Sequence, residues 1–345
     1  MLKIRSTLIT AAIFATLSVF PIATSQADNS TQQAIDVPWT LGYVTPGQSP
    51  NSRHGQDGVF YPTLNSSTNN TPSSASKAAG TGTVRYHVGG SIIANPKVYV
   101  IWYGGWDPES CSATTGTNST ASILTDLVKN IGGSDWNGIN TTYFQNIQGN
   151  KTYVSSSIVY SGCVADSGSL GLSLDSTHGP QVSDVVKSAI QNNSLPSDQD
   201  GVYLVLTASN VTVNGFLSFF CGYHSAFASG STTIKYSFIG DASASIHSCV
   251  AQPSISPNGN VIADGMANVL AHELIEPISD PLGISWFDES GLENADKCAW
   301  TWGSPARASD GSFSNTTVGN RKFLIQQNVA ANSNFCVSSL PNKGK

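Results

Sequence analysis

Residues 264–276 form the stretch that most limits how this chain can fold, because they predict a strongly apolar helix. Asp264 is of a residue type that caps helices. The apolar residues that follow recur at helical spacing: Met266, Val269, Leu270 and Leu274. His272 and Glu276 are four residues apart, so they leave such a helix on one face, one turn apart. The rest of the domain is expected to cover this helix.

The pattern of His272, Glu273 and Glu276 is that of the zinc-hydrolase helix His-Glu-x-x-His, with glutamate in place of the second histidine. In that pattern the i and i+4 side chains hold the ion, and the inner glutamate acts on a water. We therefore predict zinc ligands at His272 and Glu276 and a general base at Glu273. The same short pattern also occurs on solvated helices that bind nothing. Pro277 removes a backbone donor, which predicts that the helix ends or kinks at Glu276.

A further ligand is expected downstream, where Glu293-Asn294-Ala295-Asp296 offers two carboxylates. Glu293 follows His272 by 21 residues (293 − 272 = 21), and many metallohydrolases take a third carboxylate ligand from about that position. Asp280 and His224 are additional candidates. For His224 the alternative is a histidine that only packs beside a disulfide. One imidazole with several carboxylates is a harder donor set than most zinc sites have.

The N-terminal residues predict export. Lys3 and Arg5 precede the apolar run Leu8–Ile22, and Ser25-Gln26-Ala27 has the small-x-small form of a cleavage site. We predict a signal peptide over residues 1–27, cut after Ala27 or, alternatively, after Ser25. No later segment is expected to span a membrane. The protein should then be secreted and extracellular, in the apoplast or cell wall if it comes from a plant.

The composition limits the kinds of partner that this protein is expected to bind. Charged residues make up 11% of the 345 residues and the formal net charge is −6, with no basic run. That fraction is under half of the usual ~25%, and nucleic acid is therefore excluded as a partner. We expect a monomer that acts on an extracellular protein or a cell-wall component.

The six cysteines fit an oxidising compartment. Loop economy favours nearest-neighbour pairing, that is Cys111 with Cys163, Cys221 with Cys249, and Cys298 with Cys336. Buried free thiols are the alternative. Asn-x-Ser/Thr sequons, which would accept glycans only in a glycosylating host, lie at Asn29, Asn65, Asn69, Asn118, Asn140, Asn150, Asn192, Asn210 and Asn315.

The domain boundaries follow from composition. Residues 28–82 are polar and of low complexity, so a mostly disordered leader is predicted there. Residues 83–337 are expected to form the folded domain, and residues 338–345 a flexible tail. Strands are predicted at 84–88, 97–103, 152–160, 201–207 and 235–239, and helices at 121–131 and 181–191. This mixture indicates an α/β or α+β class, with a single layered domain, one main mixed sheet and the zincin-like central helix.

Several short motifs, in a fixed order, resemble the EXORDIUM or phosphate-induced protein family. They are Val84-Arg85-Tyr86-His87, Ile101-Trp102-Tyr103-Gly104-Gly105-Trp106, His178-Gly179, residues 201–207, Cys221-Gly222-Tyr223-His224, residues 256–260, Asp264-Gly265-Met266, Ala271-His272-Glu273-Leu274-Ile275-Glu276 with Asp280-Pro281, residues 293–298, and Phe323-Leu324-Ile325-Gln326. The resemblance covers residues 83–337. It implies an extracellular protein linked to cell expansion and growth signalling, and it attaches no reaction to the chain. Pro277 departs from the small residue expected there in relatives.

Two functions remain open at this point. The first is a secreted zincin-like metallohydrolase, such as a peptidase, with Glu273 as base. The second is a non-enzymatic growth-signalling or glycan-binding protein, which the family resemblance favours. A glycosidase that pairs Glu273 with Glu276, Glu289 or Glu293 is a further alternative. Sugar rings could then stack on Trp102, Trp106, Trp300 or Trp302, although aromatic residues at strand ends are more often core.

Overall fold

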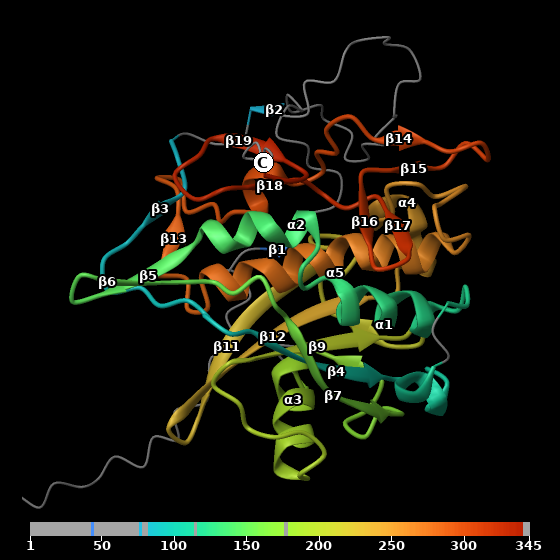
Figure 1. The fold of residues 1–345 in the computed structure, drawn as a ribbon. Helices are drawn as coiled ribbons and strands as arrows, with labels where there is room; N and C mark the ends of the chain where they lie inside the picture. Colours follow the sequence, from blue (N-terminus) through green and yellow to red (C-terminus); the bar gives the residue numbers. More distant parts are fainter. Residues whose placement is uncertain (1–42, 45–75, 78–81, 114–115, 176–178, 341–345) are drawn as a thin grey trace, which may run out of the picture. The chain divides into compact units, whose positions relative to one another are not determined.

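The computed structural model describes residues 43–44, 76–77, 82–113, 116–175 and 179–340. The predicted signal peptide, almost all of the polar leader and most of the short tail lie outside these ranges, as does His178. The described part is a mixed α/β structure with one main sheet and several helices (Figure 1).

The main sheet has five long strands in the order β11-β12-β9-β4-β7, and the two-residue β1 pairs with β11 at one edge. Their bounds are β1 Tyr43–Val44, β4 Lys97–Tyr103, β7 Val159–Asp166, β9 Gly201–Thr207, β11 Gly222–Ser229 and β12 Thr232–Gly240. β12, β9, β4 and β7 run parallel to one another, whereas β11 is antiparallel to β12. The sheet is therefore mixed, as predicted.

Side chains of the central strands alternate between two hydrophobic clusters, one on each face of the sheet. In β4, Val98, Val100 and Trp102 pack on the face that α5 covers, whereas Tyr99, Ile101 and Tyr103 pack on the opposite face. Helices α1 (Thr120–Asn130) and α5 (Val261–Ser279) lie on the first face, and α3 (Val182–Gln191) lies on the other (Figure 1). Buried on both sides, β4 and β9 show the continuous apolar runs of a central parallel strand.

Helix α5 begins one turn earlier than the sequence predicts. Its cap is Asn260, whose side-chain oxygen accepts a hydrogen bond from the backbone N–H of Ala263, 3.1 Å away. Asp264 lies inside the first turn instead, where its carboxylate accepts bonds from the backbone and side-chain nitrogens of Asn258. Every residue from Ala263 to Ser279 is buried, so the helix is enclosed on all sides, as its composition predicts.

Of the two predicted outcomes at Glu276, an end or a kink, the end was wrong, because the helix continues through Pro277 to Ser279. Proline at this position leaves the carbonyl of Glu273 without its helical donor. Ser237 of β12 supplies the missing donor, since its hydroxyl lies 2.6 Å from that carbonyl oxygen. A side chain of the sheet thus repairs the hydrogen bond that the helix itself lacks.

The shorter elements depart more from prediction. The single strand expected at 152–160 is two strands, β6 (Asn150–Tyr153) and β7, and the strand expected at 84–88 is only β3 (Arg85–Tyr86). The structure also has strands that were not predicted, of which β11 is the longest. The remaining small strands are β2 Ser76–Lys77, β5 Phe144–Ile147, β8 Ser173–Leu174, β10 Thr212–Val213, β13 Trp286–Phe287, β14 Ala306–Arg307, β15 Phe313–Ser314, β16 Thr316–Val318, β17 Arg321–Phe323, β18 Asn328–Val329 and β19 Phe335–Val337. Short helices are η1 Pro108–Ser112, α2 Asp135–Gly138, η2 Ile139–Thr142, η3 Ala242–Ser245, α4 Ile246–Cys249 and η4 Asp296–Cys298.

Three disulfides join nearest neighbours along the chain: Cys111–Cys163, Cys221–Cys249 and Cys298–Cys336. The second joins the residue before β11 to α4, and the third joins η4 to β19. Two of the three bridges therefore lie on elements that flank the acidic part of α5.

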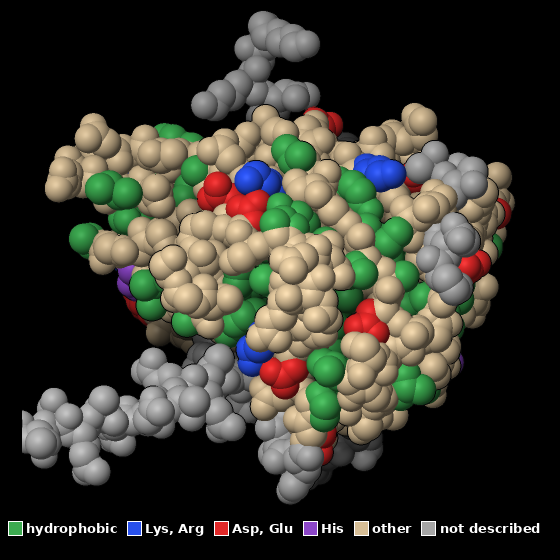
Figure 2. Space-filling model, turned by 90° about the horizontal axis from the view of Figure 1, so that it is seen from below, with side chains coloured by type: hydrophobic (Ala, Val, Ile, Leu, Met, Phe, Trp, Pro, Cys, Tyr) green, Lys and Arg blue, Asp and Glu red, His purple; other side chains and the backbone are tan. Residues whose placement is uncertain are grey.

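The surface carries few charges. Figure 2 shows the face seen from below Figure 1, on which uncharged polar side chains and backbone predominate and the Lys and Arg side chains are scattered. Among the described residues, none of the helices has both the length and the hydropathy needed to cross a membrane.

Candidate functional site

Helix α5 carries His272, Glu273 and Glu276 against the α5-facing side of β11 and β12. The helix can approach β11 closely because residue 222 is a glycine. A Cβ atom there would lie 2.5 Å from Val269 Cγ1 and 2.9 Å from Glu273 Cγ. Gly222 therefore allows the helix and the strand to come together at the level of Glu273.

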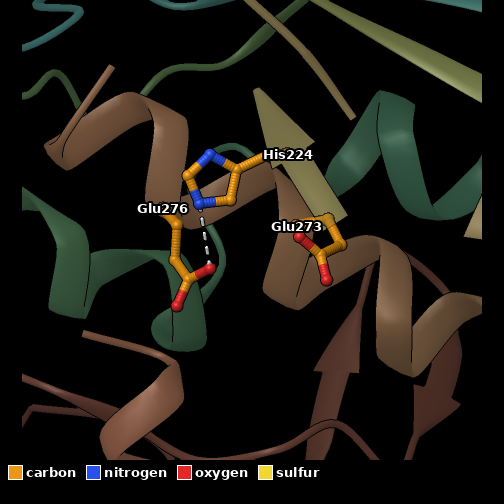
Figure 3. A group of neighbouring side chains, drawn as sticks. All are labelled: His224, Glu273 and Glu276. Atoms are coloured by element: carbon orange, nitrogen blue, oxygen red, sulfur yellow. Dashed lines mark ion pairs between the residues drawn. The ribbon is translucent and has the colours of Figure 1, made fainter. Parts of the chain in front are cut away.

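His224 reaches the same place from β11. It is paired across the strands with Ser237 of β12, so both side chains leave the same face of the sheet. Its neighbour Tyr223 packs in the cluster on the other face. Figure 3 shows the imidazole of His224 pointing at the carboxylate of Glu276, with Glu273 beside them.

The third part of the site is the segment that contains Glu293 and Asp296. Three contacts hold it. The backbone N–H of Asp296 donates to Glu276 Oε1 over 2.9 Å, Lys297 Nζ pairs with Asp288 Oδ2 at 2.5 Å, and Cys298 is bonded to Cys336. The backbone of this segment is thus tied directly to the carboxylate of the helix.

The Glu276 carboxylate lies between the two histidines. His272 Nε2 is 3.3 Å from Glu276 Oε1 and 3.5 Å from Asp296 Oδ1. His224 Nε2 is 3.3 Å from Glu276 Oε2 and 3.0 Å from Glu293 Oε2. His224, His272, Glu273 and Glu276 are fully buried, and Glu293 is 3% exposed.

Not all of these contacts are hydrogen bonds. The 3.0 Å contact between His224 and Glu293 has hydrogen-bond geometry. His272 Nε2, by contrast, makes no hydrogen bond in the structure in spite of the two carboxylate oxygens near it. The Nδ1 atoms of both histidines also lack hydrogen-bond partners among the described residues. Metal-binding histidines usually donate from their second nitrogen, and neither ring makes that bond within the part of the chain that the structure describes.

Burial and the attraction between opposite charges act against each other on the pKa values of these groups. Burial would raise the pKa of Glu276, but the two histidines outweigh it and lower that pKa to about 2. Burial raises the pKa of Glu293 to about 8, and it also raises the pKa values of Glu273 and Asp296. Burial opposes protonation of His224 and His272, yet the neighbouring carboxylates raise the pKa of each well above its usual value.

Two groups of three side chains can each hold a metal ion. One is His272, Glu276 and Asp296, and the other is His224, Glu273 and Glu276, with the ligand atoms of each group within 4.8 Å of one another. Imidazole nitrogen with carboxylate oxygens suits zinc and harder divalent ions alike. The side chains present therefore fit a metal ion.

The structure brings together most of the predicted site residues and separates one. His272, Glu273, Glu276, Glu293, Asp296 and His224 share the cluster. Asp280 has a different role: its carboxylate accepts backbone bonds from Ile284, Ser285 and Trp286. It shapes the turn that follows α5, and both of its carboxylate oxygens accept these bonds.

The other candidate residues lie away from this chemistry. Trp102, Trp300 and Trp302 are buried in the core, as aromatic residues at strand ends usually are, and Glu289 is exposed. His87 stacks on Phe287, with the ring centroids 3.6 Å apart. The sequon at Asn140 is not accessible for glycosylation in the folded protein. The Asn140 side chain is buried and hydrogen-bonded to the carbonyl of Ile275 and to Asn294.

Ser237 supports the site helix in a way that the sequence did not reveal. Its importance depends on a contact with the carbonyl of Glu273, 36 residues away. The available signal was Pro277, since a proline inside a buried helix requires some donor for the carbonyl four residues before it.

The fold and the site together define a class of protein. It is a mixed α/β domain whose central helix carries part of a buried cluster of histidines and carboxylates. A family described as the phosphate-induced protein 1 conserved region matches residues 84–339. The chain belongs to this family, as its motifs indicate.

Curated relatives agree with this family. EXORDIUM-like 5 of Arabidopsis thaliana is 28% identical over 289 residues, which is 70% of this chain and 74% of the relative. EXORDIUM-like 3 of the same plant is 28% identical over 70% of this chain and 79% of its own length. PHOSPHATE-INDUCED 1 of Nicotiana tabacum is 24% identical over 62% and 71%. No solved structure matches the chain significantly.

Proposed function

We propose that this chain is an extracellular EXORDIUM-like protein with a buried zinc centre at the zincin-like motif of α5. His272, Glu276 and Asp296 are its ligands. The observation that carries the proposal is the position of His272 Nε2, which is fully buried, makes no hydrogen bond and faces two carboxylate oxygens at 3.3 and 3.5 Å. Ligands at about 2.0–2.2 Å from a tetrahedral ion lie about 3.3–3.6 Å from one another. Those separations match co-ligands of one ion.

The catalytic form of this proposal is a metallohydrolase, with a peptidase as the nearest example. A bound zinc ion would supply Lewis acidity. Glu273 would take a proton from an attacking water, as the inner glutamate of the motif does. One of its carboxylate oxygens lies within 4.8 Å of ligand atoms of His224 and Glu276, which supports this role. Burial raises the pKa of Glu273, so a nearby positive ion is needed to keep this base ionised.

Metal analysis of the purified full chain tests the centre. We expect bound zinc after loading and dialysis, and its loss in His272→Ala. The exposed His247 gives a matched control, since His247→Ala removes an imidazole on α4 and should leave the zinc content unchanged. A loaded wild-type protein without zinc would reject the centre and leave a metal-free ionic cluster, with charged histidines opposite ionised carboxylates.

A non-enzymatic role is the second candidate, either in growth signalling or in glycan binding. The complete burial of His272, Glu273 and Glu276 favours it, because a substrate would have to reach groups with no exposed surface. Glu273→Gln separates the two functions. The change keeps the shape of the side chain and removes the base, so it should abolish hydrolysis and leave binding or growth activity intact.

Secretion is part of the proposal. The three disulfides and the family support an oxidising, extracellular destination. The signal peptide over residues 1–27 and the folded domain over 83–337 remain predictions. An extracellular protein or a cell-wall component is the proposed partner, and a monomer the proposed state. Analysis of the mature N-terminus after expression in a secreting host tests the cleavage site.

A further inference from the structure

We infer that the cluster is built for two metal ions that share Glu276, a conclusion that rests on the proposed zinc centre and extends it. The second ion would be held by His224, Glu276 and Glu293, and Glu273 keeps its role as the proposed base. The first ion keeps His272, Glu276 and Asp296.

The arrangement around Glu276 has two similar halves. Oε1 lies 3.3 Å from His272 Nε2, and Oε2 lies 3.3 Å from His224 Nε2. Each histidine also faces a carboxylate of its own, Asp296 for His272 and Glu293 for His224. A carboxylate that offers one oxygen to each of two imidazole-carboxylate pairs has the geometry of a bridging ligand. Figure 3 shows the half formed by His224, Glu273 and Glu276.

The hydrogen bond between His224 and Glu293 does not account for the position of Glu276 in this half. Glu276 Oε2 is fully buried, points at His224 and makes no hydrogen bond in the structure. A buried carboxylate oxygen without a bond is costly. An ion between Oε2 and the imidazole nitrogen would satisfy Oε2 at the present separation of 3.3 Å, because about 3.3 Å is the edge of a tetrahedral zinc site.

Charge supports two ions over one. Four carboxylates converge here, those of Glu273, Glu276, Glu293 and Asp296, and Lys297, the lysine within this segment, is already paired with Asp288. Two divalent ions with neutral histidines balance four carboxylates. A single divalent ion leaves two negative charges to be neutralised by protons in a buried site.

The two halves differ in how they behave without metal. His224 holds Glu293 through a 3.0 Å hydrogen bond, which an incoming ion must replace. His272 Nε2 has no such bond to lose. We therefore expect the His272 half to fill first and the His224 half to bind its ion more weakly.

Native mass spectrometry of chelator-treated full-length protein, titrated with Zn²⁺, tests the inference. We expect two ions per chain bound in sequence, one ion in His224→Ala, and two in the control His247→Ala. If His224→Ala does not fold, as judged by circular dichroism, the smaller change His224→Gln takes its place. Electron paramagnetic resonance of wild-type protein loaded with Mn²⁺ gives a second measurement. Two ions roughly 3.5–4 Å apart, as in two-metal sites, should show an exchange-coupled spectrum.

The outcomes separate this inference from the one on which it rests. One ion in the wild type, with the same count in His224→Ala and an uncoupled Mn²⁺ signal, would overturn the second site and leave the zinc centre intact. No ion at all would overturn both. Two ions in the wild type that persist in His224→Ala would place the second ion elsewhere and also overturn the inference.

Discussion

Single residues in the cluster differ in charge because their neighbours differ. Glu276 faces both histidines, and its pKa falls to about 2 in spite of burial. Glu293 is paired with His224 and lies near the negative Glu276 and Asp280, and burial raises its pKa to about 8. The central carboxylate is thus ionised at neutral pH, whereas the peripheral Glu293 retains a proton in the metal-free protein.

The raised pKa of Glu293 predicts a pH dependence of the metal-free protein. The folded state holds this proton up to about pH 8, whereas the unfolded chain releases it near the ordinary glutamate value of 4.5. The contribution of Glu293 to stability is therefore complete below about pH 4.5 and is lost as the pH rises toward 8. In chelator-treated protein, Glu293→Gln should lose less stability than the wild type between pH 5 and 8.

Urea unfolding at several pH values provides the measurement. The difference in the free energy of unfolding between the two proteins should change steadily across this range. A constant difference would show that Glu293 titrates alike in the folded and unfolded states.

The residues on α5 could be predicted from the sequence because helical spacing alone places His272 and Glu276 on one face. Glu293 and Asp296 followed from their distance along the chain. The role of His224 could not be settled this way, since it depends on the pairing of β11 with β12 and on which face each residue takes. The sequence of β11 is rich in the small residues Gly, Ala and Ser and gives no strong strand signal.

At the scale of elements, the contact between α5 and β12 explains why a proline is tolerated in the central helix. Pro277 cannot donate to the carbonyl of Glu273, and the Ser237 hydroxyl does so from the sheet. A local rule predicted that the helix ends or kinks at Glu276, and a contact between distant segments allows it to continue to Ser279. The strands β4 and β9 were predictable to the residue because both of their faces are buried and their runs are uniformly apolar.

This contact predicts a coupling between two positions. Ser237→Ala leaves the carbonyl of Glu273 buried without a donor and should destabilise the protein by about 1–3 kcal/mol. In Pro277→Ala the backbone N–H returns and can bond to the same carbonyl. Ser237→Ala should then cost clearly less, and denaturant unfolding of the four proteins measures the difference.

Ser279→Ala is the matched control, since Ser279 is also a buried serine near the end of α5. Its hydroxyl donates to the carbonyls of Ile275 and Glu276, and the latter already accepts the backbone N–H of Asp280. Its removal should cost less than that of Ser237. An equal cost of Ser237→Ala in both backgrounds would contradict the proposed repair.

At the scale of the whole described domain, the site is assembled from three places in the chain: β11, α5 and the segment around η4. The first two are held by the sheet and its packing. The third has little regular structure, and its position depends on the contact of Asp296 with Glu276, the ion pair of Lys297 with Asp288, and the Cys298–Cys336 disulfide. Loop economy predicted that disulfide, but the sequence could not show what it anchors.

Removal of this disulfide should affect stability and metal binding together. Cys298→Ala combined with Cys336→Ala opens a loop with a sequence separation of 38 residues. The chain-entropy estimate for such a bridge is about 3–4 kcal/mol, so the melting temperature should fall. Asp296, the proposed ligand, lies two residues before Cys298, so its position should loosen. Zinc binding should then weaken in a competition titration below the melting temperature.

The Cys111–Cys163 bridge provides the comparison. It joins η1 to β7 at the sheet edge opposite β11, with a sequence separation of 52 residues. Replacing both of these cysteines with alanine should lower the melting temperature to a similar degree, because the released loop is as long or longer. Zinc affinity should stay at the wild-type value, since none of the ligands lies on the elements that this bridge joins. An equal loss of affinity in the two double variants would show that zinc binding follows global stability and not the local anchoring of Asp296.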